Sequence, residues 1–122
     1  MLNLTTVMIC SEDPQGLSAF YTKVLGEPAW QDMGYVGWQA GNGMLLIGPH
    51  SEVKGRNDMP GRIMVNFETP DVKAEFERIK GLGVAVQHEP YQPGEATGDL
   101  WLATFEDPDG NYFQLASPMP AQ

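Results

Sequence analysis

This sequence contains few histidine or cysteine side chains that could act as metal ligands or nucleophiles, and they are widely separated. The two histidines are His50 and His88, and the single cysteine is Cys10. A histidine in a polar linker or beside a strand end is usually a solvated surface residue, so we expect neither to be a ligand. We expect Cys10 to be buried and unreactive, because a free cysteine usually behaves as a small apolar residue. The sequence contains no G-x-S-x-G elbow, Walker loop or dinucleotide fingerprint.

Large aromatic side chains are the other candidates for a functional role. On one face of a sheet, such rings form a stacking platform for a planar ligand. The same rings could instead pack in the core or at a dimer interface, where tryptophan is also common. For Trp38 and Trp101 we weigh these two interpretations equally. The aromatic candidates in or beside short apolar runs are Trp30, Trp38, Trp101, Tyr35, Tyr91 and Tyr112.

The elements that must position these side chains begin with a strand and a helix. An apolar, β-branched run at 4–9 predicts a strand. Asp13-Pro14 then predicts a helix start, and apolar residues recur every three or four positions until Gly26. Three further strands are predicted at 29–31, 35–40 and 44–47, and Asn42-Gly43 between the last two is a tight-hairpin signal.

The second half repeats this plan. A strand is predicted at 63–67, a helix opening at Asp71 and ending at Gly81 or Gly83, and strands at 85–88, 100–105 and 112–116. The two β-α-β-β-β halves are offset by about 58 positions. We therefore predict one domain over 1–122, with module 1 at 1–57, module 2 at 58–122 and a linker at 49–60. The loop at 89–99 could be a lid or an idle surface loop.

Two motifs carry a resemblance to a known family. Asp13, Phe20-Tyr21 and Val24-Leu25-Gly26, followed much later by Asp107-Pro108-Asp109-Gly110-Asn111, resemble the signatures of the glyoxalase / bleomycin-resistance / extradiol dioxygenase superfamily. The resemblance implies an α+β fold in which two βαβββ modules form a curled mixed sheet around a cleft. Both motifs also have structural roles: the Asp-Pro-Asp-Gly-Asn run is turn chemistry, and the aromatic pair favours the core.

The resemblance also implies where ligands bind, because in this superfamily the helices cover one side of the sheet and ligands occupy the other. Strand alternation then sorts residues by face. Val7, Ile9, Val65, Phe67, Phe113 and Leu115 are expected to face the helices. The expected cleft residues are Thr6, Met8, Trp38, Met44, Leu46, Met64, Asn66, Glu68, Trp101, Tyr112 and Gln114.

Metal-dependent relatives carry one ligand on each of four strands, and the matching positions here hold unsuitable residues. Those positions are Thr6, Leu46, Met64 and Gln114. Zn²⁺, Fe²⁺, Mn²⁺ or Ni²⁺ would need imidazole or carboxylate donors there. The surrounding windows at 2–9, 44–48, 61–68 and 111–117 contain no histidine, aspartate or glutamate except Glu68, at the far end of its window. We therefore predict no metal and no cofactor, and the superfamily's metal chemistry does not carry over to this chain.

The amino-acid composition narrows the classes of molecule that this protein could bind and the compartment that suits it. The net charge of −9 argues against nucleic acid and slightly favours cationic small molecules, although it could serve solubility alone. No apolar run is long enough to span a membrane, and the single cysteine suits a reducing compartment, so we predict a cytoplasmic protein.

These observations leave three functions open. The first is a metal-independent protein of the bleomycin-resistance type, sequestering an aromatic or cationic ligand in a cleft. The second is a glyoxalase- or dioxygenase-like lyase or oxygenase with an atypical active site, for instance using Glu68 as an acid–base group. The third is a non-catalytic accessory domain. The sequence does not decide whether the protein is an enzyme. By analogy with relatives, we expect a homodimer whose partner is a small molecule.

Overall fold

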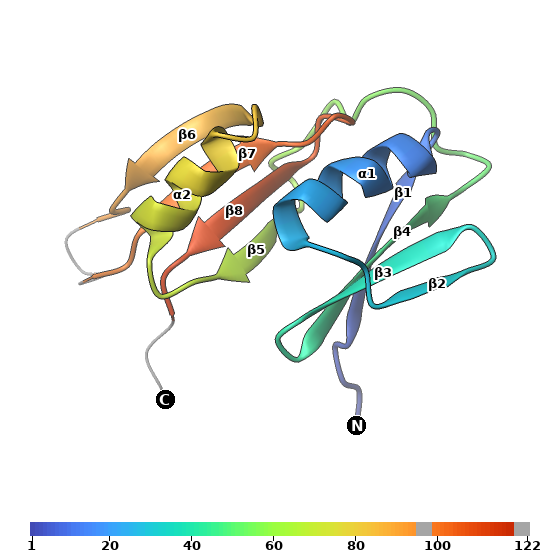
Figure 1. Ribbon diagram of the computed structural model, residues 1–122, viewed down its shortest axis with the longest axis horizontal. Helices are drawn as coiled ribbons and strands as arrows, with labels where there is room; N and C mark the ends of the chain where they lie inside the picture. Colours follow the sequence, from blue (N-terminus) through green and yellow to red (C-terminus); the bar gives the residue numbers. More distant parts are fainter. Residues whose placement is uncertain (95–98, 119–122) are drawn as a thin grey trace. The chain divides into compact units, whose positions relative to one another are not determined.

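The computed structural model describes residues 1–94 and 99–118. The chain divides into two compact units, Met1–Arg56 (unit 1) and Asn57–Gln122 (unit 2). Each unit contains one helix and one four-stranded sheet, and Figure 1 draws each helix on the near side of its own sheet. The predicted α+β class with two βαβββ modules is confirmed.

Unit 1 has the strand order β1-β4-β3-β2. Only the β1–β4 pair is parallel, and the other neighbours are antiparallel. Its elements are β1 (Thr6–Ser11), α1 (Pro14–Leu25), β2 (Trp30–Asp32), β3 (Tyr35–Ala40) and β4 (Gly43–Pro49).

Unit 2 repeats this topology with the order β5-β8-β7-β6, again with one parallel pair, β5–β8. Its elements are β5 (Val65–Glu68), α2 (Val72–Lys80), β6 (Ala85–Tyr91), β7 (Leu102–Glu106) and β8 (Tyr112–Ala116). The strand at 112–116 is the predicted one, whereas β5 and β7 begin two residues later than predicted.

Both helices begin at the predicted aspartates. The Asp13 carboxylate accepts a hydrogen bond from the Gly16 backbone N–H at 3.1 Å. The Asp71 carboxylate accepts one from the Ala74 N–H at 3.0 Å. Each satisfies a helix N–H that has no partner within the helix. Gly26 follows α1 with φ 93°, a conformation that suits glycine and ends the helix.

The core of each unit lies between its helix and one face of its sheet. In unit 1, α1 packs against β4, β1 and β3, and in unit 2, α2 packs against β6, β8 and β7. The Phe76 ring stacks on Phe105 with centroids 5.2 Å apart, and Phe105 stacks on Phe113 at 5.4 Å. The buried apolar residues include Leu17, Tyr21, Val24, Trp38, Leu45, Ile47, Val72, Phe76, Ile79, Ala103, Phe105, Phe113 and Leu115.

The turn between β7 and β8 is held by one buried carboxylate. Asp107 Oδ1 accepts hydrogen bonds from the backbone N–H groups of Asp109 and Asn111, both at 2.9 Å. The Asn111 side-chain amide donates to Oδ2 of the same carboxylate at 3.0 Å. These bonds support the structural interpretation of the Asp-Pro-Asp-Gly-Asn motif.

The segment predicted as a loop at 89–99 differs from expectation at its start. Strand β6 continues to Tyr91, with register shifts on either side of His88. Each shift allows pairing with β7 to resume after an irregularity, which the short predicted strand did not anticipate. Residues 95–98 of the predicted lid lie outside the described residues. No helix in the described part of the chain is long and apolar enough to cross a membrane.

Candidate functional site

The face of each sheet opposite its helix, here called the open face, carries most of the predicted cleft residues. In unit 1, strand register sets Trp30 beside Gly37, Gly37 beside Leu46, and Leu46 beside Met8. Residues paired in this way share one face of a sheet. We call this set, which crosses all four strands, the apolar row: Met8, Leu46, Gly37 and Trp30.

Two glycines make room on this face. A Cβ atom at Gly37 would lie 2.7 Å from Leu46 Cδ2 and 3.5 Å from Trp30 Cε3. The Met44 sulfur would lie 3.4 Å from the same atom. A Cβ atom at Gly48, in the next row, would collide with the Tyr35 ring. The large side chains therefore lie over glycine backbone, forming a flat apolar surface.

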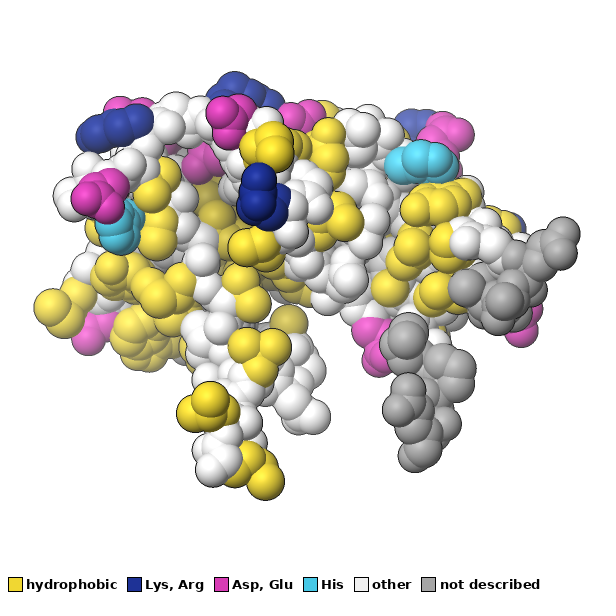
Figure 2. All heavy atoms as spheres, turned by 180° about the vertical axis from the view of Figure 1, so that it is seen from behind, with side chains coloured by type: hydrophobic (Ala, Val, Ile, Leu, Met, Phe, Trp, Pro, Cys, Tyr) yellow, Lys and Arg dark blue, Asp and Glu magenta, His cyan; other side chains and the backbone are white. Residues whose placement is uncertain are grey.

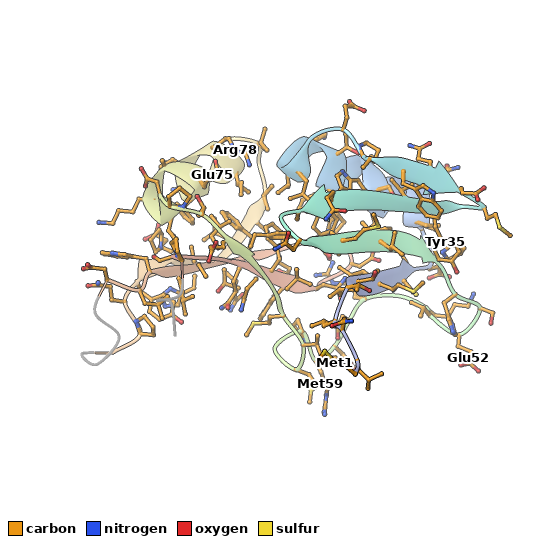
Figure 3. The ribbon with its side chains drawn as sticks, turned by 90° about the horizontal axis from the view of Figure 1, so that it is seen from below. Met1, Tyr35, Glu52, Met59, Glu75 and Arg78 are labelled. Carbon is orange, nitrogen blue, oxygen red and sulfur yellow. The ribbon has the colours of Figure 1, made fainter. Side chains whose placement is uncertain are left out.

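This surface is open to solvent. Met8 is 53% exposed and Trp30 is 44% exposed, whereas Leu45 and Ile47, on the other face of β4, are buried. Hydrophobic side chains gather over unit 1 in Figure 2, on the left. The Tyr35 side chain lies near one end of the unit 1 strands in Figure 3. Exposed apolar surface of this kind is typical of a ligand-binding or interaction face.

The open face of unit 2 carries polar residues at the positions that match the apolar row. Asn66 lies beside Gln114, Gln114 beside Thr104, and Thr104 beside His88. The Gln114 side-chain amide donates to the Thr104 hydroxyl at 2.9 Å, and both residues are buried. We call Asn66, Gln114, Thr104 and His88 the polar row. Glu68 and Tyr112 lie on the same face by strand alternation.

A family model described as a glyoxalase-like domain matches residues 6–116. The chain belongs to the glyoxalase-like domain family. No curated protein matches the chain.

Several solved structures share this glyoxalase-like fold. A lactoylglutathione lyase from Agrobacterium tumefaciens is 23% identical with a TM-score of 0.71, covering 94% of this chain and 92% of that one. A glyoxalase/bleomycin resistance protein/dioxygenase family enzyme from Burkholderia phytofirmans PsJN is 20% identical with a TM-score of 0.73, covering 95% and 98%. TnmS3, an antibiotic binding protein from Streptomyces sp. CB03234, is 22% identical with a TM-score of 0.73, covering 97% of each chain. At these identities the likeness shows the fold alone.

Two tryptophans assigned to the cleft of this glyoxalase-like chain lie instead on the helix-facing side. Trp38 is buried, and its indole N–H donates to the Gly26 carbonyl at 2.9 Å. Trp101 alternates with buried Ala103 and Phe105, and the Lys73 ammonium of α2 lies 4.0 Å from its ring centroid. Both assignments were wrong, because each ring packs against or beside the helix end of its unit.

Cys10 also differs from expectation. It pairs with Gly48, so it belongs to the open face of unit 1, and it is only half-buried. Strand β1 continues two residues beyond the predicted end, and alternation from Met8 then brings Cys10 onto the same face as the apolar row.

The other predicted cleft residues divide between the units. Thr6, Met8, Met44 and Leu46 lie on the open face of unit 1, and Asn66, Glu68, Tyr112 and Gln114 on that of unit 2. Met64 lies just before β5 and is exposed. The prediction missed Gly37, Gly48, Thr104 and His88, and it named Trp30 and Tyr35 only as aromatic candidates. Counting back through the Gly41-Asn42 turn would have placed Gly37 opposite Leu46, and counting back through the Met33-Gly34 turn would have placed Trp30 opposite Gly37.

The strand positions expected to hold a metal ion do not fit one. Register pairs Leu46 with Met8 rather than Thr6, and Gln114 with Asn66 rather than Met64. This shift brings in a thioether and an amide, and still no imidazole or carboxylate. Within residues 1–94 and 99–118, no three His, Cys, Asp or Glu side chains are grouped so that they could hold a metal ion.

Proposed function

We propose that this glyoxalase-like protein binds a small aromatic molecule, without a metal ion, on the open face of unit 1. The observation that carries the proposal is the convergence of Trp30, Leu46 and Met44 over Gly37. A flat apolar surface with an exposed indole favours stacking of a planar ring. The fold shared with an antibiotic binding protein from Streptomyces is compatible with this role.

Binding can be tested with the planar compounds acridine and 9-aminoacridine and with bleomycin, by calorimetry. We expect saturable binding of at least one, and we expect Trp30→Ala to weaken it about 5–10-fold, the loss of one aromatic stacking contact. Met33→Ala is the control, because Met33 is an exposed residue of the β2–β3 turn. Absence of binding across the three compounds, or equal affinity of the Trp30 variant, would contradict the proposal.

Metal independence has its own measurement. We expect purified protein to contain far less than one equivalent of zinc, iron, manganese or nickel by elemental analysis. Binding should also be unchanged after treatment with EDTA. A near-stoichiometric metal whose removal abolishes binding would overturn this part of the proposal.

We also propose a homodimer, a state common among proteins of this superfamily. Several large apolar side chains, including Leu4 and Ile63, remain exposed in the single chain. Contact with a second copy would remove such groups from water. Light scattering after size-exclusion chromatography should give twice the chain mass of 13.4 kDa. A monomer mass at high micromolar concentration would contradict the dimer.

A further inference from the structure

The two open faces differ at matching positions of the same topology. Each row crosses all four strands of its unit in the order given above, but unit 1 supplies Met, Leu, Gly and Trp where unit 2 supplies Asn, Gln, Thr and His. A polar face opposite the core is common in sheets covered by helices on one side only, but here Thr104 and Gln114 are 4% and 8% exposed although they lie on the face that α2 does not cover. The polar row therefore needs a separate chemical explanation.

The Gln114 amide is held in one orientation. Its nitrogen donates to the Thr104 hydroxyl, and Gln114 is only 8% exposed. Because this bond fixes the nitrogen toward Thr104, the amide oxygen, which is the only acceptor of the side chain, points in a defined direction. Among residues 1–94 and 99–118, no donor contacts this oxygen. In the described part of the chain only Ser18 Oγ is a buried side-chain polar atom without a partner, so the Gln114 amide oxygen is accessible and can accept a donor from a ligand.

His88 supplies a second acceptor at the other end of the row. Its Nδ1 lies 2.7 Å from the Glu89 carbonyl oxygen. Because a carbonyl oxygen can only accept, this contact places the proton on Nδ1 and leaves Nε2 as an acceptor in the neutral ring.

The charges on the unit 2 strands reinforce this preference. Glu68 lies on the same face as Asn66, two positions along β5, and it is exposed. The four strands of unit 2 contain no lysine or arginine. A carboxylate or phosphate on this face would meet the negative charge of Glu68, and no lysine or arginine of these strands would balance it.

We propose that the polar row is a second subsite, which takes a planar ligand group bearing N–H donors, such as a carboxamide or an amidinium, and rejects carboxylates. The inference rests on the proposed small-molecule binding but concerns a different face and a different chemistry. The predicted cleft residues Asn66 and Gln114 would bind the group directly, and Thr104 would act as a positioning residue.

Three small probes of nearly equal shape test the subsite: benzamide, benzamidine and benzoate. In an NMR titration of the full chain, we expect benzamide or benzamidine to shift the side-chain amide signals of Asn66 and Gln114. Benzamide is neutral and benzamidine is cationic, so comparing their binding shows whether a positive charge on the donor group is needed. Benzoate should shift neither signal at the same concentration.

Variants sharpen the test. Gln114→Leu should weaken binding of the active probe at least about threefold, the loss of one hydrogen bond. Glu68→Gln should weaken benzamidine more than benzamide. Thr104→Val should weaken the active probe while Thr104→Ser, which keeps the hydroxyl, should retain it. Gln31→Leu is the control, because Gln31 pairs with Val36 on the helix-facing side of unit 1.

The outcomes separate this inference from the proposed function. Equal shifts with benzoate, or no effect of Gln114→Leu, overturn the subsite while acridine binding to unit 1 can stand. Shifts from benzamide or benzamidine alone support the subsite even if the acridine compounds fail to bind. No shift from any of the three probes overturns the subsite.

Discussion

At the residue scale, glycine is the residue that shapes the candidate site. Gly37 and Gly48 leave space that is filled by Leu46 and Tyr35 from neighbouring strands. A glycine inside a strand often marks such a close approach, because it has no side chain of its own to pack. The flat surface on unit 1 thus depends on two residues that contribute no side-chain atoms to it.

Substitution of Gly48 tests this dependence. Gly48→Ala should displace the Tyr35 ring and lower the free energy of unfolding by about 1–3 kcal/mol, measured by urea denaturation. In a Tyr35→Ala background the same change should have much less effect, because the colliding ring is gone.

Gly61→Ala is the matched control, since nothing lies within 4 Å of a Cβ atom at Gly61. A loss of stability at Gly48 that is the same with and without the Tyr35 ring would show that the collision is not the cause.

At the element scale, the turn between β7 and β8 depends on Asp107. Its carboxylate accepts two backbone N–H bonds and is 3% exposed, so its removal would leave buried donors without partners. Asp107→Ala should lower the free energy of unfolding by about 2–4 kcal/mol. Asp107→Asn keeps one acceptor oxygen and should cost less, as measured by urea denaturation. Equal stability of Asp107→Ala and the parent protein would contradict this role.

The elements themselves could be predicted well from the sequence, and the reasons are local. Asp13 and Asp71 cap the two helices, and the alternation of Phe113 and Leu115 with their neighbours is typical of a strand such as β8. The bulged end of β6 could not be predicted, because pairing with β7 overrides the weak strand signal around Pro90.

The site was harder to predict than the fold. A tryptophan suits a core and a binding face equally, so composition could not place Trp38 or Trp101; their neighbours on α1 and α2 decide the matter. Two members of the polar row were missed for a different reason, although Asn66 and Gln114 were among the predicted cleft residues. Thr104 and His88 belong to it only through pairing across strands, and the shifted register of β6 hides His88 from simple counting.

At the scale of the whole molecule, the net charge of −9 bears on which ligands approach. Salt screens such attraction over roughly 10 Å at 0.1 M ionic strength. If the charge assists binding, affinity for cationic 9-aminoacridine should fall at least about twofold between 20 and 300 mM NaCl, as measured by calorimetry. Neutral acridine should bind equally at both salt concentrations. Identical salt responses of the two compounds would restrict the charge to a role in solubility.

The positions of the apolar row and the polar row determine how substitutions in them affect folding. Each row lies on the side of its sheet that α1 or α2 does not cover, while the buried aromatic and aliphatic residues lie on the other side. Substitutions at the exposed members of the rows, Met8, Trp30, Asn66 and His88, should therefore change the chemistry of the open faces with little effect on folding. A combinatorial library confined to these positions should yield many folded variants with new specificities, and the scaffold is a natural starting point for directed evolution.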